Sequence, residues 1–578
     1  MGDLKVMKKI LKLSFLVMEL AVVPAWSQVL PPAAGVSDRD LRVTPISPEA
    51  KPISPPVLNP SAESSPVPVQ MTVLGFNFTG NDNIPTKTLE SLVGDYVNRQ
   101  LDLPALDAVA DRVSRYYRQQ GYSVARAYIP PHTSIEGVVQ IAILEGKYAL
   151  VNLRNTSVID SDRLSKTIAN NVCAGDTLAQ CKNQVITDEP LERAVLLMRD
   201  LPGMTANVNL QAGATMGTSD LGIHAKDTAA HAVSIGFDNY GTKSTGVTRM
   251  SVNADFNNPA HNGDQLSLGI TTTGTHSNSG NVSYSVPVDY SGMRVGASLA
   301  RGFYRLGAGF ENILSHGTST SLNVFSSYPI IRSVNRSLYF RAVAEARAMD
   351  DNIDAGSILY SHKTASTVRI GLNGDAIDNF GGGGYNIYSI NYVHGRIGIS
   401  GNSVAADLAG ANTQGDYSKL TYSIGRQQTI AGATTLYSAL NGQFAGAKNL
   451  DGSEQIGIGG PTAVRAYAGE ASGSTGAVGV IELRYTQPPT SLEYIIPNAL
   501  VTYGAFVDRG WVKIYRNTWQ PSQATTNTRA LFGYGVSLTL QSKNFQLRGI
   551  YAVHPDSQPS QVDPSSKEQV WLQLGFNF

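Results

Sequence analysis

The sequence predicts a β-rich membrane protein in which two small α/β modules precede an antiparallel transmembrane β-barrel of about 16 strands. Three observations lead to this fold class. Residues 229–578 consist of short segments in which apolar and polar residues alternate, residues 69–226 contain one β-α-α-β-β pattern twice, and residues 1–27 have the features of an export signal. After residue 30, no apolar run approaches the roughly 18 residues of a membrane-spanning helix, so membrane segments would have to be strands.

Residues 1–27 are predicted to be a secretory signal peptide. Four lysines precede a short apolar stretch at residues 13–23, and the small residues Ala25 and Ser27 stand where a signal peptidase would cut. Glu19 is unusual within such a stretch. The alternative is a helical membrane anchor, which the short apolar middle disfavours.

Residues 28–68 are predicted to be a proline-rich linker. They contain 10 of the 28 prolines, with Ser, Ala and Glu between them. Because such a segment buries too little apolar surface to offset the entropy cost of ordering, we expect an extended chain.

Residues 69–148 are predicted to form the first α/β module. After an opening strand near residues 73–78, apolar residues recur every three or four positions in residues 89–97 and 106–117, which predicts two helices that each bury one face. Gly121 ends the second helix, and two short strands follow at residues 123–129 and 138–144.

Residues 149–226 repeat this order with a second module. A strand at 150–153 is followed by helices at 161–171 and 191–198 and by strands at 208–210 and 221–225. Each module would be a small three-stranded sheet that is covered on one face and has an open edge strand. The two cysteines of the chain, Cys173 and Cys181, lie in this module. A zinc site would need further ligands nearby, so a local structural disulfide is the better interpretation for an exported chain.

Residues 229–578 are predicted to form the barrel. At roughly 20 to 24 residues per strand and connection, this length holds about 16 strands. Alternation is clear at residues 233–238, 250–256, 340–347, 481–485 and 570–578. A soluble β-sandwich can show the same alternation. The export signal, the low charge, the aromatic C-terminus and the 26 tyrosines, which suit interfacial girdles, favour the membrane barrel.

Charge and motif content argue against several functions. The chain has 45 basic and 45 acidic residues, whereas a nucleic-acid binder needs a concentrated basic face. No Gly-x-Ser-x-Gly nucleophile elbow is present, which argues against a barrel-linked lipase. The sequence contains no metal-ligand cluster, and the four glycines at 381–384 indicate a turn rather than a phosphate loop. We therefore expect no enzymatic activity, no cofactor and no metal.

Several short motifs follow one another along the chain. The first module contains Tyr116-Tyr117, Gly121-Tyr122, Ala125-Arg126-Ala127, Ile129-Pro130 and Leu144-Glu145-Gly146. The second contains Leu201-Pro202-Gly203 and residues 213–221, and the barrel region contains Asn239-Tyr240-Gly241, Gly263-Asp264, residues 328–333 and Ser453-Glu454-Gln455. From about residue 70 to the C-terminus, these motifs resemble the two-partner secretion transporters of the bacterial outer membrane, the TpsB type of the haemolysin secretion/activation family. That family belongs to the superfamily of barrels preceded by periplasmic POTRA domains.

The resemblance implies that the linker and both modules lie in the periplasm and that the modules are POTRA domains. The barrel would export one large, unfolded, β-rich partner protein to the cell surface without ATP. This partner would be an adhesin, a haemolysin or a contact-dependent toxin. Barrel-assembly machinery and periplasmic chaperones would act during biogenesis, with Phe576 and Phe578 as the C-terminal insertion signal, and outer-membrane lipid would surround the barrel. Open sheet edges suit capture of an extended client by strand addition.

The family's functional signature is a Val-Arg-Gly-Tyr motif in the sixth extracellular loop, which folds back into the lumen. This chain has alanine in place of the glycine, and the matching residues are Val464, Arg465, Ala466 and Tyr467. The motif's arginine is expected to meet an aspartate of a Phe-x-Asp-x-Gly motif on an inward-facing strand, here Phe506, Asp508 and Gly510. Alanine at 466 would matter only if the backbone there requires a positive φ.

A physical argument for a pair between Arg465 and Asp508 stands apart from the resemblance. An arginine in a barrel lumen costs desolvation unless a carboxylate receives its planar fork, and a two-point contact then holds the loop in one register. The alternative is that Arg465 is a solvated loop residue and Asp508 an ordinary turn residue.

Two other functions remain as alternatives. A barrel-assembly insertase of the same superfamily is the nearest, although insertases commonly carry more POTRA domains. A passive porin is the other, although a porin needs no N-terminal modules.

Overall fold

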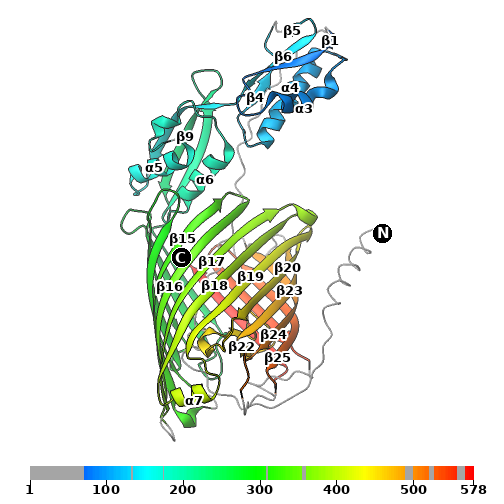
Figure 1. Ribbon diagram of the computed structural model, residues 1–578. Coiled ribbons are helices and arrows are strands. Elements are labelled where there is room, and N and C mark those ends of the chain that lie inside the picture. Colours follow the sequence, from blue (N-terminus) through cyan, green and yellow to red (C-terminus); the bar gives the residue numbers. More distant parts are fainter. Residues whose placement is uncertain are drawn as a thin grey trace.

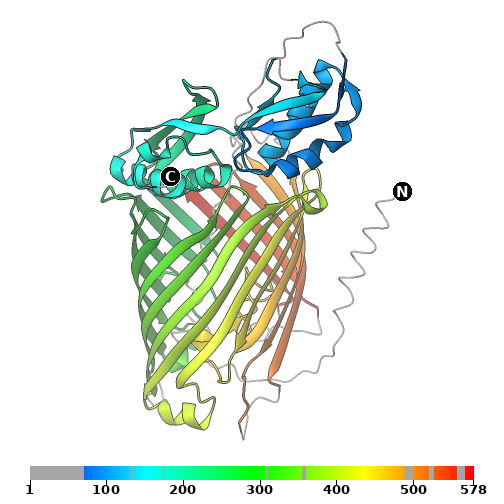
Figure 2. The same cartoon turned by 45° about the horizontal axis from the view of Figure 1, so that its top comes forward.

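The computed structural model describes residues 70–578 except for gaps at 132–133, 174, 308–309, 355–358, 488–498, 520–525 and 556–565. The predicted signal peptide at 1–27 and the predicted linker at 28–68 lie outside the described residues. Within the described ranges, every helix is too short or too polar to cross a bilayer. Two α/β modules stand at one end of a large barrel, as Figures 1 and 2 show.

The first module contains a small sheet packed against two helices. Its elements are β1 (Met71–Val73), β2 (Gly75–Thr79), α3 (Thr86–Val93), β3 (Arg99–Leu101), α4 (Leu103–Gln119), β4 (Arg126–Tyr128), β5 (Ser134–Ile135) and β6 (Val138–Leu144). The strand order is β2-β6-β4, with β2 parallel and β4 antiparallel to β6. The predicted apolar helix faces form its core, with Leu89, Val109 and Val113 fully buried.

The helix ends of the first module follow local chemistry. Asp102 caps α4, because its side chain accepts a hydrogen bond from the amide of Ala105. The predicted helix at 89–97 is wrong in its length: α3 ends at Val93, a 3-10 turn follows at Gly94–Tyr96, and Val97 is already extended. Glycine is a poor helix former, and the chain then turns into β3, an edge strand that the sequence pattern did not indicate.

The second module repeats the predicted order. Its elements are β7 (Lys147–Asn155), α5 (Ser161–Val172), a 3-10 turn (Leu178–Cys181), α6 (Asp188–Arg199), β8 (Met204–Ala212) and β9 (Thr218–Asp227). The strand order is β7-β9-β8, so β7 and β8 are the outer strands. Cys173 at the end of α5 and Cys181 form a disulfide that lies in the buried core.

The rest of the chain forms a closed antiparallel barrel of 16 strands, as predicted. In chain order its strands are β10 (His231–Asp238), β11 (Arg249–Asn257), β12 (Gln265–Thr272), β13 (Ser277–Pro287), β14 (Arg294–Arg305), β15 (Ser315–Arg332), β16 (Arg336–Ile353), β17 (Leu359–Asp378), β18 (Gly384–Gly401), β19 (Gly415–Ala431), β20 (Thr434–Ala445), β23 (Thr475–Gln487), β24 (Leu500–Lys513), β25 (Thr528–Gln541), β26 (Phe545–Val553) and β27 (Glu568–Asn577). The described connections between the strands also contain a short helix, α7 (Val404–Ala409), and a two-residue ladder of β21 (Ile456–Gly457) and β22 (Ser472–Gly473). Three 3-10 turns lie in the same described connections, at Glu311–Ile313, Phe380–Gly382 and Gly452–Glu454.

The alternation read from the sequence separates the two faces of the barrel wall. On β15, Leu322 and Val324 point outward and are more than half exposed, whereas Ser319 and Ser321 point inward and are buried. An apolar outer face is the surface that lipid covers. The first and last strands close the barrel through a register of five residue pairs, from Ser234 opposite Asn577 to Asp238 opposite Gln573.

The second module rests on one rim of the barrel through polar contacts. Nη2 of Arg193 on α6 donates to the carbonyl of Ser291 (3.1 Å), in the turn between β13 and β14, and to that of Pro329 (2.8 Å) near the end of β15. Asp200, at the end of α6, receives the guanidinium of Arg332 from β15 in a two-point contact, with both N–O distances 2.8 Å. These contacts hold the module directly over this rim (Figure 1).

Candidate functional site in the barrel lumen

The connection between β20 and β23, residues 446–474, carries the predicted loop motif. We call it the sixth loop. Its tip is a turn in which the amide of Tyr467 donates to the carbonyl of Val464 (3.2 Å). Val464, Ala466 and Tyr467 are buried in an apolar cluster with inward-facing residues of the strands from β23 to β27. The loop therefore folds back into the lumen.

Arg465 and Asp508 are in direct contact. Nε of Arg465 donates to Oδ2 of Asp508 and Nη2 donates to Oδ1, both at 2.8 Å. The Arg465 amide adds a third bond to Oδ2 at 3.0 Å. The Arg465 side chain is 3% exposed and that of Asp508 0%. Such a buried two-point contact fixes both the position and the orientation of the loop tip.

A second carboxylate, that of Glu482 on β23, also forms an ion pair with Arg465. Its Oε2 accepts from Nη1 of Arg465 (3.1 Å) and from Nη2 of Arg484 (3.1 Å), and its Oε1 accepts from the hydroxyl of Ser537. Sequence reasoning did not assign this residue to the site. The alternation could have indicated it: Ile481 and Leu483 on either side of Glu482 face lipid, so Glu482 faces the lumen. An inward-facing carboxylate needs a cation nearby.

The other residues of the strand motif shape the cradle of the tip. The guanidinium carbon of Arg465 lies 3.3 Å from the centre of the Phe506 ring, which is a cation–π contact. A Cβ atom at Gly510 would lie 3.0 Å from Cγ2 of Val464, and one at Gly533 only 2.6 Å from Cβ of Ala466. Because glycine has no side chain, these two positions leave room for the loop tip.

Alanine fits the position at which the loop motif departs from its family pattern. Ala466 is not among the described non-glycine residues with positive φ, so its Cβ causes no backbone strain. The next residue, Tyr467, stacks on His554, with ring centres 4.8 Å apart and planes inclined by 14°.

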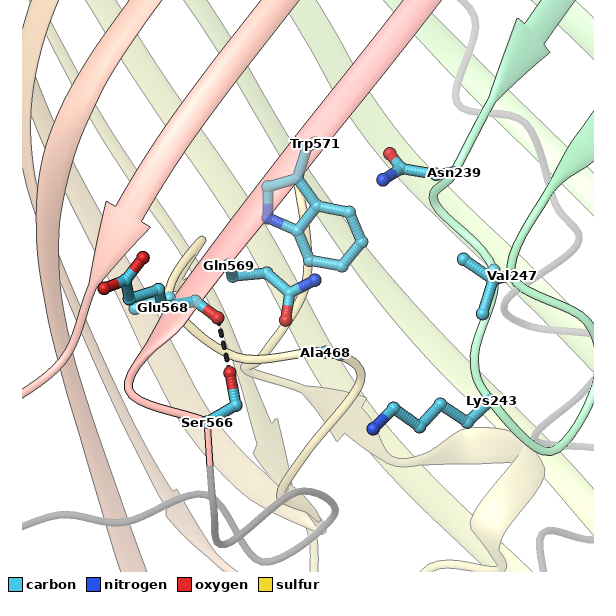
Figure 3. Close-up of a pocket in the computed structure, with 10 residues that line it drawn as sticks. Asn239, Lys243, Val247, Ala468, Ser566, Glu568, Gln569 and Trp571 are labelled. Carbon is cyan, nitrogen blue, oxygen red and sulfur yellow. Dashed lines mark hydrogen bonds between the residues drawn. The ribbon is translucent and has the colours of Figure 1, made fainter. Parts of the chain in front are cut away.

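The carbonyl of Arg465 links the loop tip to the last strand. It accepts a hydrogen bond from the indole nitrogen of Trp571 on β27 (2.7 Å). The Trp571 and Tyr240 rings are perpendicular, with ring centres 5.8 Å apart. A pocket of about 110 Å³ opens between this indole, Ala468 of the loop and Lys243 of the β10–β11 connection (Figure 3). The loop tip thus contacts the last strand and lies beside the connection that follows the first strand.

Comparisons with known proteins assign the family. A model described as "Haemolysin secretion/activation protein ShlB/FhaC/HecB" matches residues 217–540, and one described as "POTRA domain, ShlB-type" matches residues 71–146. The first match alone spans more than half of the chain. The chain belongs to the haemolysin secretion/activation family. It is an outer-membrane transporter of the two-partner secretion type, and its POTRA domains lie in the periplasm.

Individual relatives match over nearly the whole length. The heme/hemopexin transporter protein HuxB of Haemophilus influenzae (strain 86-028NP) is 26% identical over 94% of each chain. The outer membrane transporter CdiB of Dickeya dadantii (strain 3937) is 22% identical over 84% of this chain and 83% of its own. The solved structure of CdiB from Escherichia coli superposes with a TM-score of 0.67 at 18% identity, covering 90% of this chain and 93% of the other, and so shares the fold.

This transporter's orientation follows from the position of its modules. The rim under the second POTRA domain faces the periplasm, and the sixth loop joins two strands at the extracellular end. The C-terminal strand ends near the periplasmic rim (Figure 1). There Phe576 lies against Phe545, with ring centres 5.5 Å apart, and Phe578 is 72% exposed. Whether these two residues form the insertion signal stays a prediction.

The motif residues of the first POTRA domain meet where it joins the second. The carboxylate of Glu145 accepts from the amide of Asn83 (2.8 Å), from the Asn83 side chain and from the hydroxyl of Tyr117 (3.1 Å). Burial, helped by the nearby Glu145, raises the pKa of Tyr117, so its hydroxyl remains a donor. Gly146 follows with φ of +83°, and a Cβ there would clash with Val124.

The described residues contain no group of three His, Cys, Asp or Glu side chains arranged to hold a metal ion. What the lumen site can do is electrostatic and mechanical: it holds a loop inside the pore.

Proposed function

We propose that this transporter recognises an unfolded, β-rich partner protein in the periplasm through its POTRA domains and exports it to the cell surface without ATP. The observation that supports the proposal most directly is the pairing of two features in one chain. Sheet strands β2 and β4 of the first POTRA domain and β7 and β8 of the second lie at the edges of their sheets. They precede a closed barrel whose lumen holds a loop through buried ion pairs and hydrogen bonds.

Capture by strand addition follows from the chemistry of a sheet edge. The backbone donors and acceptors of an outer strand can pair with any extended segment, whatever its side chains. A client that is held extended by such pairing is also kept from folding early. Folding of the client outside the cell would then make its return unfavourable, which supplies direction without a nucleotide.

The lumen pair has a defined role in this proposal. We propose that Arg465 and Asp508 hold the sixth loop in the export-competent state. The partner protein would be of the adhesin, haemolysin or contact-dependent toxin class. Barrel-assembly machinery and periplasmic chaperones would serve the transporter only during its own biogenesis.

Deletion of residues 69–148 tests the proposal. The transporter is co-expressed with a candidate partner, a large secreted β-rich protein, and this partner is measured on the cell surface and in the medium. We expect a barrel that inserts normally, judged by outer-membrane fractionation and by a gel mobility that changes on boiling, but that no longer exports the partner. Export at the normal yield would contradict recognition by the first POTRA domain. Loss of other outer-membrane proteins from cells that lack the transporter would instead favour the insertase alternative.

A further inference from the structure

A second cluster of buried charges holds the sixth loop on another part of the barrel wall. The 3-10 turn at Gly452–Glu454 and the residue before it provide two carboxylates, those of Asp451 and Glu454. The wall provides three cations, Arg347 of β16, Lys363 of β17 and Lys419 of β19. The contacts of Arg465 described above are made with other strands, β23, β24 and β27.

The contacts of Glu454 involve both its side chain and its backbone. Its carboxylate lies 2.9 Å from Nζ of Lys419 and 3.4 Å from Nη1 of Arg347. Its carbonyl accepts from Nζ of Lys419 (2.7 Å) and from the side-chain amide of Gln443 on β20 (2.9 Å). The side chains of Arg347 and Glu454 are 1% and 6% exposed. Charges buried this deeply are costly unless they are paired.

Asp451 and Gln455 stabilise the turn on either side of Glu454. Oδ2 of Asp451 accepts from Nζ of Lys363 (2.7 Å), and its Oδ1 accepts from the amide of Ser453 (3.0 Å). Nε2 of Gln455 donates to a carbonyl of the same loop (3.1 Å). The Ser453-Glu454-Gln455 motif, to which the proposed function gives no role, therefore builds an acidic turn that faces the cations of the wall.

The acidic turn and the tip also pack in separate apolar clusters. Leu450, next to the turn, is 2% exposed and is buried with residues of the strands from β14 to β19, among them Met349 and Tyr417. Val464 and Tyr467 are buried with residues of the strands from β23 to β27. We call the contacts of Leu450, Asp451 and Glu454 the turn anchor, and those of Val464, Arg465, Tyr467 and Glu470 the tip anchor.

The tip anchor has several contacts besides the ion pairs of Arg465. Tyr467 stacks on His554, as described above. The buried carboxylate of Glu470 pairs with Nη2 of Arg529 on β25 (3.3 Å). Between the two anchors, the β21–β22 ladder closes the loop on itself. Both ends of the loop are thus held firmly, and the loop leaves the lumen only when both anchors have opened.

We propose that Glu454 is the centre of a second anchor that keeps the sixth loop in the lumen independently of the Arg465–Asp508 pair. Among their described contacts, the two anchors share no wall residue. Their free energies of release therefore add, and loss of one anchor leaves the other in place. Glu454 is accordingly a positioning residue for transport, because it holds the loop that carries Arg465.

The potassium current through the purified, full-length transporter in planar lipid bilayers measures release of the loop without a partner protein. This inference rests on the proposed function only in taking the seated loop as the export-competent state. A transporter whose anchors behave as expected in the current but that exports no partner would overturn the proposed function and leave the second anchor standing.

Four variants separate the two anchors. R465A removes the ion pairs of the tip, E454Q removes the charge of the turn but keeps its shape, and R465A/E454Q does both. With glutamine at 454, Lys419 loses the carboxylate and keeps its bond to the carbonyl. The matched control is R465A/D378N, since Asp378 pairs with Arg426 to join β17 to β19 rather than the loop to the wall.

We expect E454Q alone to leave the open time close to that of the wild type, because the tip anchor remains closed. R465A/E454Q should exceed R465A in open time by at least about tenfold, since a buried cation has then lost its carboxylate. R465A/D378N should match R465A. Equal open times in R465A/E454Q and R465A would overturn the proposal. It would also be overturned if E454Q alone opened as long as R465A/E454Q, or if D378N acted like E454Q.

A covalent bridge repeats the test within one sample, so differences in folding yield do not enter. In R465A/E454C/K419C, a short bis-methanethiosulfonate replaces the ion pair by a bridge that a reductant removes. Before bridging, the open time should resemble that of R465A/E454Q, and bridging should return it to that of R465A. Wild-type protein treated with the same reagents controls for the native Cys173–Cys181 disulfide. An open time that bridging leaves unchanged would overturn the second anchor.

Discussion

Two arginine–aspartate pairs in this molecule have the same geometry and different surroundings. Arg465 and Asp508 meet inside the barrel lumen, and Arg332 and Asp200 meet where the second POTRA domain rests on the rim. In both, Nε and Nη2 donate to the two carboxylate oxygens at 2.8 Å. The lumen side chains are 3% and 0% exposed, whereas those at the rim are 19% and 33% exposed.

The difference shows that hydrogen-bond geometry alone does not determine how much an ion pair contributes to stability. Water can solvate either rim residue if its partner is lost, so that pair contributes little. Loss of Arg465 leaves the buried Asp508 without its cation, and loss of Asp508 leaves Arg465 only Glu482, which Arg484 shares. We therefore expect lumen variants to affect transport strongly and rim variants to adjust only how firmly the POTRA domain is held.

The largest effect should come from Arg465→Ala or Asp508→Ala. Arg465→Ala leaves the buried Asp508 without its cation, and Asp508→Ala leaves Arg465 only Glu482, which Arg484 shares. For a buried pair, such a loss costs about 3 to 5 kcal/mol. Export should fall sharply while barrel insertion, followed by heat-modifiable gel mobility, survives, because the strand ladder does not depend on the loop. A double-mutant cycle on the export rate checks direct pairing. If the two alanine effects simply add, the residues do not act as a pair.

A smaller effect is expected from Cys173→Ser, which opens the disulfide in the second POTRA domain. Closing this short loop stabilises the domain by roughly 2 to 3 kcal/mol on the chain-entropy estimate. Limited proteolysis of the full-length protein in urea should show cleavage of this domain at lower denaturant, with the barrel unchanged. Wild-type protein under reducing conditions is the control and should behave like the variant. Equal resistance of all samples would mean that the rim contacts, not the disulfide, limit unfolding.

Trp571→Phe should have an effect below that of the disulfide. It keeps an aromatic ring in the lumen but removes the donor to the Arg465 carbonyl, which costs about 1 to 2 kcal/mol for a buried acceptor. A spin label at residue 468 of the loop should become more mobile, while a label at residue 452 should not. The matched control is Tyr240→Phe, since the Tyr240 ring packs perpendicular to the indole, with ring centres 5.8 Å apart. If the label at residue 468 has the same mobility in Trp571→Phe and Tyr240→Phe, loss of the indole hydrogen bond has no effect of its own. Ring packing alone would then hold the tip.

The smallest effect is expected from Arg332→Ala at the rim. A partly exposed pair is worth about 1 kcal/mol or less, and salt screens it. The distance distribution between spin labels on α6 and on the barrel should broaden slightly, and raising the salt concentration should broaden it in the wild type to the same extent. Barrel insertion and export should remain near normal. A loss of export as large as that of Arg465→Ala would refute the comparison of the two pairs.

Much of the fold could be predicted because its pattern is local. Alternation in residues such as 481–485 defines which side chains face lipid, and the helical spacing at 106–117 defines the buried face of α4. The error at α3 has the same origin: the apolar spacing continues to Val97, but Gly94 ends the regular helix first. Of the candidate site, only the residues that belong to sequence motifs could be predicted. These include Arg465 and Asp508 but not Glu482.

By itself, the sequence determined the repeated module, the alternating strands and the two motifs, since each depends on residues within a few positions of one another. Tertiary structure decided the partners. Arg465 meets Asp508 across 43 positions, Trp571 meets the Arg465 carbonyl across 106, and Arg347 meets Glu454 across 107. Such contacts depend on strand register and on closure of the ring, and a shift of one residue would turn every inward side chain toward lipid. Burial of the paired charges, which gives them their strength, likewise exists only once the loop has entered the lumen.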